Sequence, residues 1–438
     1  MRFLLMAGLV MSGIAAAQDA KDAPPRFPGL DQSRIDEAIR RGIEYLRDAE
    51  SPDHDLKIKG QVYDIADSNE LILLTFLHAG SPETDPKVQE LLKKILESKL
   101  ERTYKVSLQA MCLEELDRVK HQQRIAQCAQ FLVDNQCPNG QWSYGTPSVY
   151  TEDVPTTAPR SDVSTGRPSE RKPKDAPPPS NAKTKPTVTV KRQVIQKRSG
   201  PPGGDNSNSQ YAALGLRACH DAGILFQKSV IDKARDWWVK CQHPAGKGAA
   251  MPPADAKPAG PAVASGTAPV AIPGEPRGWC YNDVYGNCKG SGPAYSSMTV
   301  GAVGALCIYD FILVRDWKRD KVVADGLAWL TQNFSVTENV GPAETGKSQP
   351  LSWIYYTLYG MERVGLLYGT ERLGAHEWYP EGARVILEAQ RGDGSWRVSP
   401  YKEPTWDTCF AILFLRRATR PLENVASVDK TPGAKQDR

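Results

Sequence analysis

The sequence predicts an all-α protein, an (α/α)6 toroid in which six helical hairpins form an outer and an inner ring of helices. The first observation is a helical periodicity of apolar residues that recurs along most of the chain. The second is that two Pro-rich segments interrupt this pattern and separate otherwise similar units. The third is composition: 438 residues, 40% of them hydrophobic, with ten Trp, supply a sizeable core. We place the toroid at residues 31–420.

The first helix of each predicted hairpin carries charges on one face and apolar residues at helical spacing on the other. Residues 34–43, which read RIDEAIRRGI, are an example. Such a helix covers a core on one side and meets water on the other, so these helices are expected in the outer ring. Each ends near a pair of large apolar residues: Tyr45-Leu46, Ile95-Leu96, Phe131-Leu132, Trp237-Trp238, Leu327-Ala328 and Val385-Ile386.

The second helix of each hairpin begins with small or polar residues and is then apolar nearly all round. A helix without a polar face must be surrounded by protein, so these helices are expected in the inner ring. In residues 298–314 only Asp310 is charged before Arg315, and a membrane span is disfavoured there because the hairpin repeat explains the apolar run. The predicted inner helices cover residues 67–78, 104–116, 208–219, 297–309, 352–364 and 405–415.

Two insertions and a tail are predicted to be disordered. Residues 145–204 are rich in Pro, Ser, Thr, Lys and Arg, and residues 243–276 are rich in Pro, Ala and Gly. Neither has enough large apolar residues to offset the entropy of folding. Residues 158–204 hold 11 Lys and Arg against three Asp and Glu, so the first insertion is expected to touch anionic envelope polymers or to act as a solvated tether. The tail covers residues 421–438.

The N-terminus has the plan of a secretory signal peptide, with a charged start, an apolar middle and small residues at its end. Arg2 precedes the apolar run of residues 3–16, and Ala15-Ala16-Ala17 precedes Gln18. The run is shorter than the roughly 20 residues that cross a bilayer. We therefore expect residues 1–17 to be removed, a mature chain without a transmembrane segment, and a periplasmic or secreted protein.

Export would place the nine cysteines in an oxidising compartment. An odd count leaves at least one unpaired. Cys280 and Cys288 flank a loop rich in Gly and Asn, and they are the candidate disulfide. The remaining cysteines that lie in apolar helical runs, such as Cys112 and Cys409, are expected to be core residues.

A spaced motif of Gln, Gly and Trp follows several outer helices. Residues 131–142 read FLVDNQCPNGQW and residues 385–396 read VILEAQRGDGSW, so that Gln136 and Gln390 each precede Gly and Trp at the same spacing. A third copy, Trp237-Trp238 to Gln242, resumes at Gly278-Trp279 after the second insertion. Gln can cap backbone groups at a helix end, and Gly permits the tight turn that returns Trp to the helix.

These motifs resemble the QW repeat of the squalene and terpene cyclases. Together with residues 208–216 and 406–415, they make the chain similar to secreted bacterial members of the prenyltransferase and squalene-cyclase-like toroid superfamily. The resemblance implies an α/α toroid with a central cavity and covers most of residues 31–420 outside the insertions. This architecture hosts cyclases, prenyltransferases, polysaccharide lyases and non-catalytic domains, so fold alone does not set the activity.

The acids and metal ligands that the resemblance implies are missing from the sequence. The chain lacks the Asp-x-Asp-Asp motif with which class II terpene cyclases protonate an alkene, and Asp407 and Asp283 are the nearest single acids. Asp407 is also well placed to stabilise a helix N-terminus. The zinc triad of the prenyltransferases is incomplete, and no other His and Cys spacing indicates a metal site. We predict neither a metal nor a cofactor.

Residues 341–348, GPAETGKS, match the residue types of a phosphate-binding loop. That loop works between a strand and a helix, where backbone N–H groups converge on phosphate, and here it lies between two helices. We therefore expect no nucleotide site.

Polar and aromatic residues near the starts of the inner helices are the candidates for lining a cavity. A closed ring of helices either fills its centre with such side chains or leaves a ligand site there. The candidates are Asn208, Gln210, Tyr211, Trp353, Tyr355, Tyr356 and Trp406.

Three functions remain open at this point. The first is a non-catalytic exported protein that binds a ligand or partner, such as an isoprenoid lipid, a carbohydrate or a protein, through its cavity or rim. The second is a terpene-cyclase-like isomerase that acts on an isoprenoid with Asp407 or Asp283 as its acid. The third is a polysaccharide lyase or hydrolase in the same cavity.

Overall fold

The computed structural model describes residues 30–48, 69–154, 185–244, 274–281, 294–341, 353–398 and 404–422, and the backbone of two short strands at residues 56–58 and 61–63. The predicted signal peptide, residues 155–184 of the first insertion, most of the second insertion, most of the predicted tail, Asp283 and Cys288 lie outside these residues.

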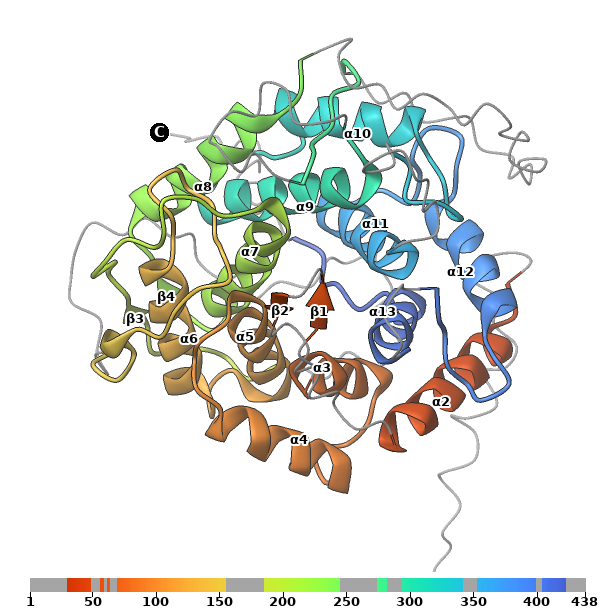
Figure 1. The fold of residues 1–438 in the computed structure, drawn as a ribbon, viewed down its shortest axis with the longest axis horizontal. Helices are drawn as coiled ribbons and strands as arrows, with labels where there is room; N and C mark the ends of the chain where they lie inside the picture. Colours follow the sequence, from red (N-terminus) through yellow and green to blue (C-terminus); the bar gives the residue numbers. More distant parts are fainter. Residues whose placement is uncertain are drawn as a thin grey trace, which may run out of the picture.

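Helices dominate the described residues and form two concentric rings (Figure 1). The outer ring consists of α2 (Gln32–Asp48), α4 (Pro86–Glu97), α6 (Gln122–Asp134), α8 (Lys228–Cys241), α10 (Lys321–Gln332) and α12 (Trp378–Ala389). The inner ring consists of α3 (Asn69–Ala79), α5 (Thr103–Asp117), α7 (Asn206–Asp221), α9 (Ser296–Ile312), α11 (Ile354–Tyr368) and α13 (Thr405–Arg416). Each inner helix packs against the next, and α13 packs against α3. The predicted all-α toroid is confirmed.

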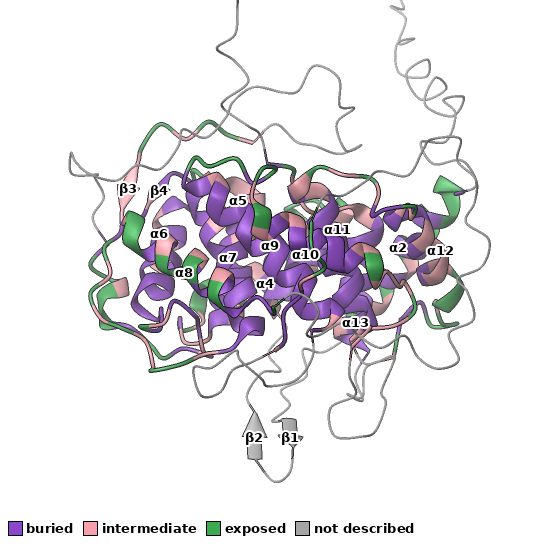
Figure 2. Cartoon of the chain, turned by 90° about the horizontal axis from the view of Figure 1, so that it is seen from above, coloured by how far each residue is buried: buried purple, intermediate pink, exposed green. Residues whose placement is uncertain are grey.

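Burial follows the hydrophobic pattern of the two helix types. In α2 the buried residues recur every three or four positions, as in Ile35, Ile39 and Leu46, while the opposite face is exposed. In α9 every residue except Phe311 is buried. Figure 2 shows the same contrast, with buried residues through the inner ring and exposed ones on the outer helices. Within the described part of the chain, no helix is long and apolar enough to span a membrane.

Capping side chains fix the starts of several helices. Asp85 accepts a hydrogen bond from the backbone of Lys87 at the start of α4, and Pro86 occupies the first turn, where a missing N–H costs nothing. Asp320 caps α10 and Asp205 caps α7 in the same way. These caps set where the loops end and the ring begins.

Strands play a minor part. β1 (Leu56–Ile58) pairs with β2 (Gln61–Tyr63) in an antiparallel hairpin, with Leu56 opposite Tyr63. β3 (Arg192–Gln193) and β4 (Ile224–Leu225) form a parallel pair in which Arg192 lies opposite Ile224. A 3-10 turn, η1 (Val149–Thr151), follows the loop after α6.

The first insertion differs from the prediction at both of its ends. Residues 145–154 and 185–204 are held against the toroid, and only residues 155–184 lie outside the description. Lys185 pairs with Glu115 at 2.7 Å, the side chain of Gln122 donates to the carbonyl of Val190 at 2.6 Å, and Val194 is buried. The composition of this segment did not reveal these contacts, because the acids and amides that satisfy its charges and backbone belong to α5 and α6.

The Gln side chains of the three motif copies connect neighbouring outer helices. Each donates from Nε2 to a backbone carbonyl in the next outer helix along the ring. The three bonds are Gln136 to Val230 at 2.8 Å, Gln242 to Val322 at 3.0 Å and Gln390 to Ala38 at 2.8 Å. The last of these joins α12 to α2 and thereby closes the outer ring. The Gln side chains were predicted to cap backbone groups at helix ends, and they instead link each outer helix to a carbonyl within the next one.

The Trp side chains of the same copies fold back on the helix that precedes them. Each indole N–H donates to a carbonyl near the end of that helix: Trp142 to Leu132 at 2.7 Å, Trp279 to Trp238 at 2.8 Å and Trp396 to Ile386 at 2.7 Å. All three indoles are fully buried. The backbone N–H of each Trp also donates to a hydroxyl on an inner helix, that of Ser209, Thr299 or Thr408. Each copy is thus a wedge between two outer helices and one inner helix.

Gly140 and Gly394 make the turns that carry these wedges. Their φ angles of +96° and +87° lie in the left-handed region that favours glycine. A Cβ at Gly140 would lie 2.1 Å from the carbonyl oxygen of Lys233, and one at Gly394 would lie 2.5 Å from that of Arg41. The motif glycines therefore also allow the turn to contact the next outer helix.

We expect Gly140→Ala to lower the free energy of unfolding by at least about 2 kcal/mol, because it adds a side chain to a left-handed residue and forces it against a carbonyl. Urea denaturation measures this. Gly392→Ala is the control, since no atom lies within 4 Å of a Cβ there. Equal stability of the two variants would contradict this role for the motif glycine.

Candidate functional site

Hydroxyl groups from three inner helices meet at the N-terminal ends of those helices. The hydroxyl of Tyr104, on α5, contacts that of Ser207 on α7. Ser207 is also 3.1 Å from the hydroxyl of Tyr356 on α11. The side chain of Gln210 donates to the same Tyr356 hydroxyl. These four residues form a continuous hydrogen-bonded path across the ring, which we call the hydroxyl path.

Aromatic rings surround the hydroxyl path. Tyr211 lies 4.3 Å from Tyr104 and 6.3 Å from Tyr356, measured between ring centroids. Phe410, on α13, lies 5.5 Å from Tyr356. Towards the surface, Trp353 packs 6.0 Å from Tyr356 and stacks 6.2 Å from Trp406. Trp353 and Trp406 are only partly buried, so this aromatic wall extends from the surface to the interior of the ring.

A buried arginine ends the hydroxyl path. Arg363, on α11, is 3% exposed, and its Nη2 donates to Gln210 Oε1 at 3.0 Å. Its guanidinium lies 4.5 Å from the ring centroid of Tyr359 and 5.6 Å from that of Tyr211. No carboxylate in the described residues forms an ion pair with it. A cation in this setting is stabilised by rings and an amide in place of an opposite charge.

The tyrosines of this cluster act as neutral groups. Burial raises the pKa of Tyr211 and Tyr356, and it raises that of Tyr359 to about 12. A phenol that keeps its proton at neutral pH can donate and accept hydrogen bonds, but it is a poor general base. The proton abstraction that a polysaccharide lyase needs is therefore disfavoured at these hydroxyls.

The structure brings together five of the nine predicted site residues. Gln210, Tyr211 and Tyr356 lie in the cluster described above, and Trp353 and Trp406 lie in its aromatic wall. Two others have different surroundings. The side chain of Asn208 donates to Asp205 at 2.8 Å and so supports the cap of α7. The pKa of the Tyr355 hydroxyl is raised by burial and by nearby Asp407.

Asp407 is placed as a helix-end acid. It lies in the first turn of α13, it is 2% exposed, and its Oδ2 accepts a hydrogen bond from the backbone N–H of Val398 at 2.8 Å. The carboxylate thus holds the segment that follows Trp396 against α13. Asp283, the second candidate acid, lies outside the described residues.

Only one cysteine of the predicted Cys280–Cys288 disulfide is described by the structure. Cys280 is buried, but Cys288 lies outside the described residues, so their pairing stays a prediction. The cysteines that were expected in the core, among them Cys112 and Cys409, are buried.

Within the described residues, no three side chains of His, Cys, Asp or Glu are placed to hold a metal ion. The prediction that residues 341–348 form no nucleotide site is not tested. Gly341 alone of the segment that resembles a phosphate-binding loop is described.

Three members of the cluster, Tyr104, Ser207 and Arg363, were not predicted from the sequence. Tyr104 and Ser207 bond to each other across two helices and lie more than a hundred residues apart in the chain, so no local pattern connects them. A signal for Arg363 was present, since it follows Glu362 within an otherwise apolar stretch of α11. A charged pair on a helix that is buried on all sides marks a position where packing alone does not explain the residue.

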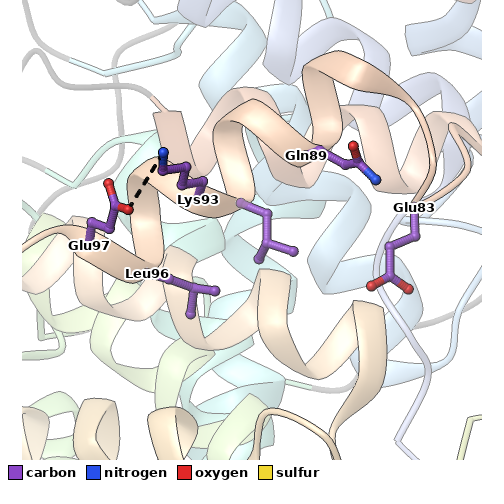
Figure 3. A pocket seen from close by; sticks show the side chains of 6 residues that line it. Glu83, Gln89, Lys93, Leu96 and Glu97 are labelled. Carbon is purple, nitrogen blue, oxygen red and sulfur yellow. Dashed lines mark ion pairs between the residues drawn. The ribbon is translucent and has the colours of Figure 1, made fainter.

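A surface pocket of about 350 Å³ lies on the outer face of α4 (Figure 3). Its lining comprises Glu83, Gln89, Leu92, Lys93, Leu96 and Glu97. Lys93 and Glu97 form a long ion pair of 4.0 Å, and their side chains are 74% and 67% exposed. Solvated charges of opposite sign offer little selectivity for a ligand, so the central cluster is the better candidate site.

Glu362 adds a second ionisable group beside the cluster. It is fully buried and accepts hydrogen bonds from the backbone N–H of Thr419 at 2.9 Å and from the Thr419 hydroxyl at 2.6 Å. Burial raises the pKa of this carboxyl from 4.5 to about 7, more than these hydrogen bonds and Arg363 lower it. Glu362 thus provides incomplete charge compensation for Arg363 at neutral pH.

No family model matches this chain, and no curated protein matches it either. Among solved structures, it is similar to the type II terpene cyclase MstE from Scytonema. A variant of that enzyme in complex with its substrate, geranylgeranyl dihydroxybenzoate, has a TM-score of 0.43 and 11% identity, over 88% of this chain and 97% of the other. The apo enzyme has a TM-score of 0.29 and 11% identity, over 89% and 99% of the two chains. Similarities this distant carry no inference about activity.

The raised pKa of Glu362 predicts that its contribution to stability is lost as the pH rises. A carboxyl whose pKa is higher in the folded state favours folding below its unfolded pKa, and this contribution fades between pH 4.5 and about 7. This rise in the pKa of Glu362 corresponds to about 3 kcal/mol in the free energy of unfolding. We expect Glu362→Gln to remove this part of the pH dependence of unfolding by urea, measured from pH 4 to pH 8. Glu371→Gln, at a 53% exposed side chain, is the control. Parallel pH profiles for wild type and Glu362→Gln would contradict the assignment.

Proposed function

We propose that this chain is an exported, non-catalytic toroid protein that binds an isoprenoid-like apolar ligand in the centre of its inner ring. The observation that carries the proposal is the meeting of the hydroxyl path with an aromatic wall from α11 and α13. Aromatic faces and a few fixed polar groups are the usual lining of small-molecule sites.

The composition of the wall favours an apolar ligand over a carbohydrate. Trp353, Tyr356, Phe410 and Trp406 offer ring faces that run from the surface inwards. The hydroxyl groups of the path are already engaged with one another, so few remain to replace the many hydrogen bonds that a sugar makes with water.

The surroundings of Asp407 support binding without catalysis. A cyclase acid must stay protonated and must face the substrate. The Asp407 carboxyl instead accepts a backbone hydrogen bond from Val398 at the start of α13, so one of its oxygens is engaged with the protein itself. The terpene-cyclase-like alternative would then need Asp283 or another acid.

We propose export because the N-terminus resembles a signal peptide. We also propose that the part of the basic first insertion between its two described ends contacts anionic envelope polymers. Lys185, at one of these ends, already pairs with Glu115. Its positive charge is therefore compensated within the protein, and we propose that lysines and arginines of residues 158–184 contact such polymers.

The first experiment is retention of lipid by the purified full chain. We expect the protein, after incubation with an envelope lipid extract and washing, to retain an isoprenoid that mass spectrometry detects in the solvent eluate. Tyr356→Ala should reduce the retained amount about tenfold, because it removes both a ring contact and the centre of the hydroxyl path. Tyr150→Ala, at an exposed tyrosine of η1, is the matched control. Retention that is absent from wild type, or unchanged in Tyr356→Ala, would overturn the proposal.

Asp407→Asn separates the binding proposal from the cyclase alternative. Asn keeps an oxygen that accepts the Val398 N–H but cannot donate an acidic proton. We therefore expect ligand retention to be unchanged and no product to form from the retained isoprenoid in either protein. A product formed by wild type and absent from Asp407→Asn would identify Asp407 as a catalytic acid.

A further inference from the structure

Arg363 carries a charge that no carboxylate of the described residues neutralises through an ion pair. It is 3% exposed on a helix inside the ring, and its Nη2 donates a hydrogen bond to the neutral Gln210. Its Nη1 is buried and lacks a hydrogen-bond partner among the described residues. Buried arginines are normally paired with a carboxylate or another anion.

The hydroxyl of the neighbouring Tyr211 also lacks a hydrogen-bond partner in the described part of the chain by the same geometric criterion. It is buried, and the Tyr211 ring faces the Arg363 guanidinium. Two donors that are buried together and left unsatisfied are costly, so such groups in a native protein call for an explanation. The Nη1–H of Arg363 and the O–H of Tyr211 both suit an acceptor of negative charge.

The nearest acid does not complete the pair. Glu362 directs both of its carboxylate oxygens to Thr419. Other buried acids pair with a different basic group or cap a helix. Asp310, for example, forms an ion pair with Arg235 at 2.6 Å, and Asp205 caps α7. No acid of the described residues therefore forms an ion pair with Arg363.

We infer that Arg363, with Tyr211, holds the anionic group of an amphiphilic ligand whose apolar part lies along the aromatic wall of Tyr356, Phe410 and Trp353. This inference rests on the proposed function and narrows its ligand to an apolar molecule with a small acidic group. A carboxylate and a phosphate share the required chemistry, since an arginine binds either through charge-assisted hydrogen bonds.

Four simple amphiphiles test the inference on the full-length chain: decanoate, decyl phosphate, decan-1-ol and decyltrimethylammonium. They share an alkyl chain and differ in charge. Isothermal titration calorimetry gives their dissociation constants. We expect one or both anions to bind at least about tenfold more tightly than decan-1-ol, and the cation to bind most weakly. Comparison of decanoate with decyl phosphate then distinguishes a carboxylate ligand from a phosphate ligand.

Substitutions test whether Arg363 causes the preference for anionic amphiphiles. Arg363→Met keeps an unbranched apolar side chain of similar reach and should abolish the preference for anions while decan-1-ol still binds. Tyr211→Phe removes a single hydroxyl and should weaken anion binding only, which keeps the test valid if Arg363→Met does not fold. The control is Arg417→Met, because Arg417 also lies over aromatic rings, those of Trp378 and Tyr379, but outside the cluster.

The outcomes separate this inference from the proposed function. If decan-1-ol and the anions bind with equal affinity, or if Arg363→Met and Tyr211→Phe retain the anion preference, the apolar site stands and the inference about Arg363 is wrong. If none of the four amphiphiles binds, the proposed ligand-binding function fails with it.

Discussion

Closure of the ring is the constraint on which the rest of this structure depends. The inner helices are apolar on nearly every side, so none of them can be buried by a single partner. They are covered only when each has two inner neighbours and outer helices behind it, as α9 has with α7, α11, α8 and α10. The bond from Gln390 to the carbonyl of Ala38 joins the two ends of this arrangement.

The wedges between outer helices explain how closure tolerates long insertions. Gln, Gly and Trp in each copy bind backbone atoms, and backbone atoms are present whatever side chains the neighbouring helix carries. The copy that contains Trp237 is interrupted after Gln242, yet Trp279 still reaches the carbonyl of Trp238. An insertion between these positions therefore leaves the ring contacts in place.

A closed ring also creates the low-polarity centre in which the candidate site lies. Burial there keeps the tyrosine hydroxyls neutral and leaves the charge of Arg363 poorly screened. The same cation on the outer surface would be solvated and would select little. The properties of the site thus come from the burial of common residue types at the centre of the ring, and no special sequence motif is needed to explain them.

Local pattern was enough to predict the helices, their two classes and the residues at the wedges. Apolar periodicity and the spacing of Gln136, Gly140 and Trp142 act over a single helix and its turn, so they can be read along the chain. The ends of the first insertion could not be predicted this way, because Lys185 and Val190 depend on partners in α5 and α6. The centre of the ring was likewise decided by tertiary structure. Whether Tyr356 meets Ser207, or Arg363 is left without a carboxylate, depends on which helices the closed ring makes neighbours, and sequence separation carries no information about that.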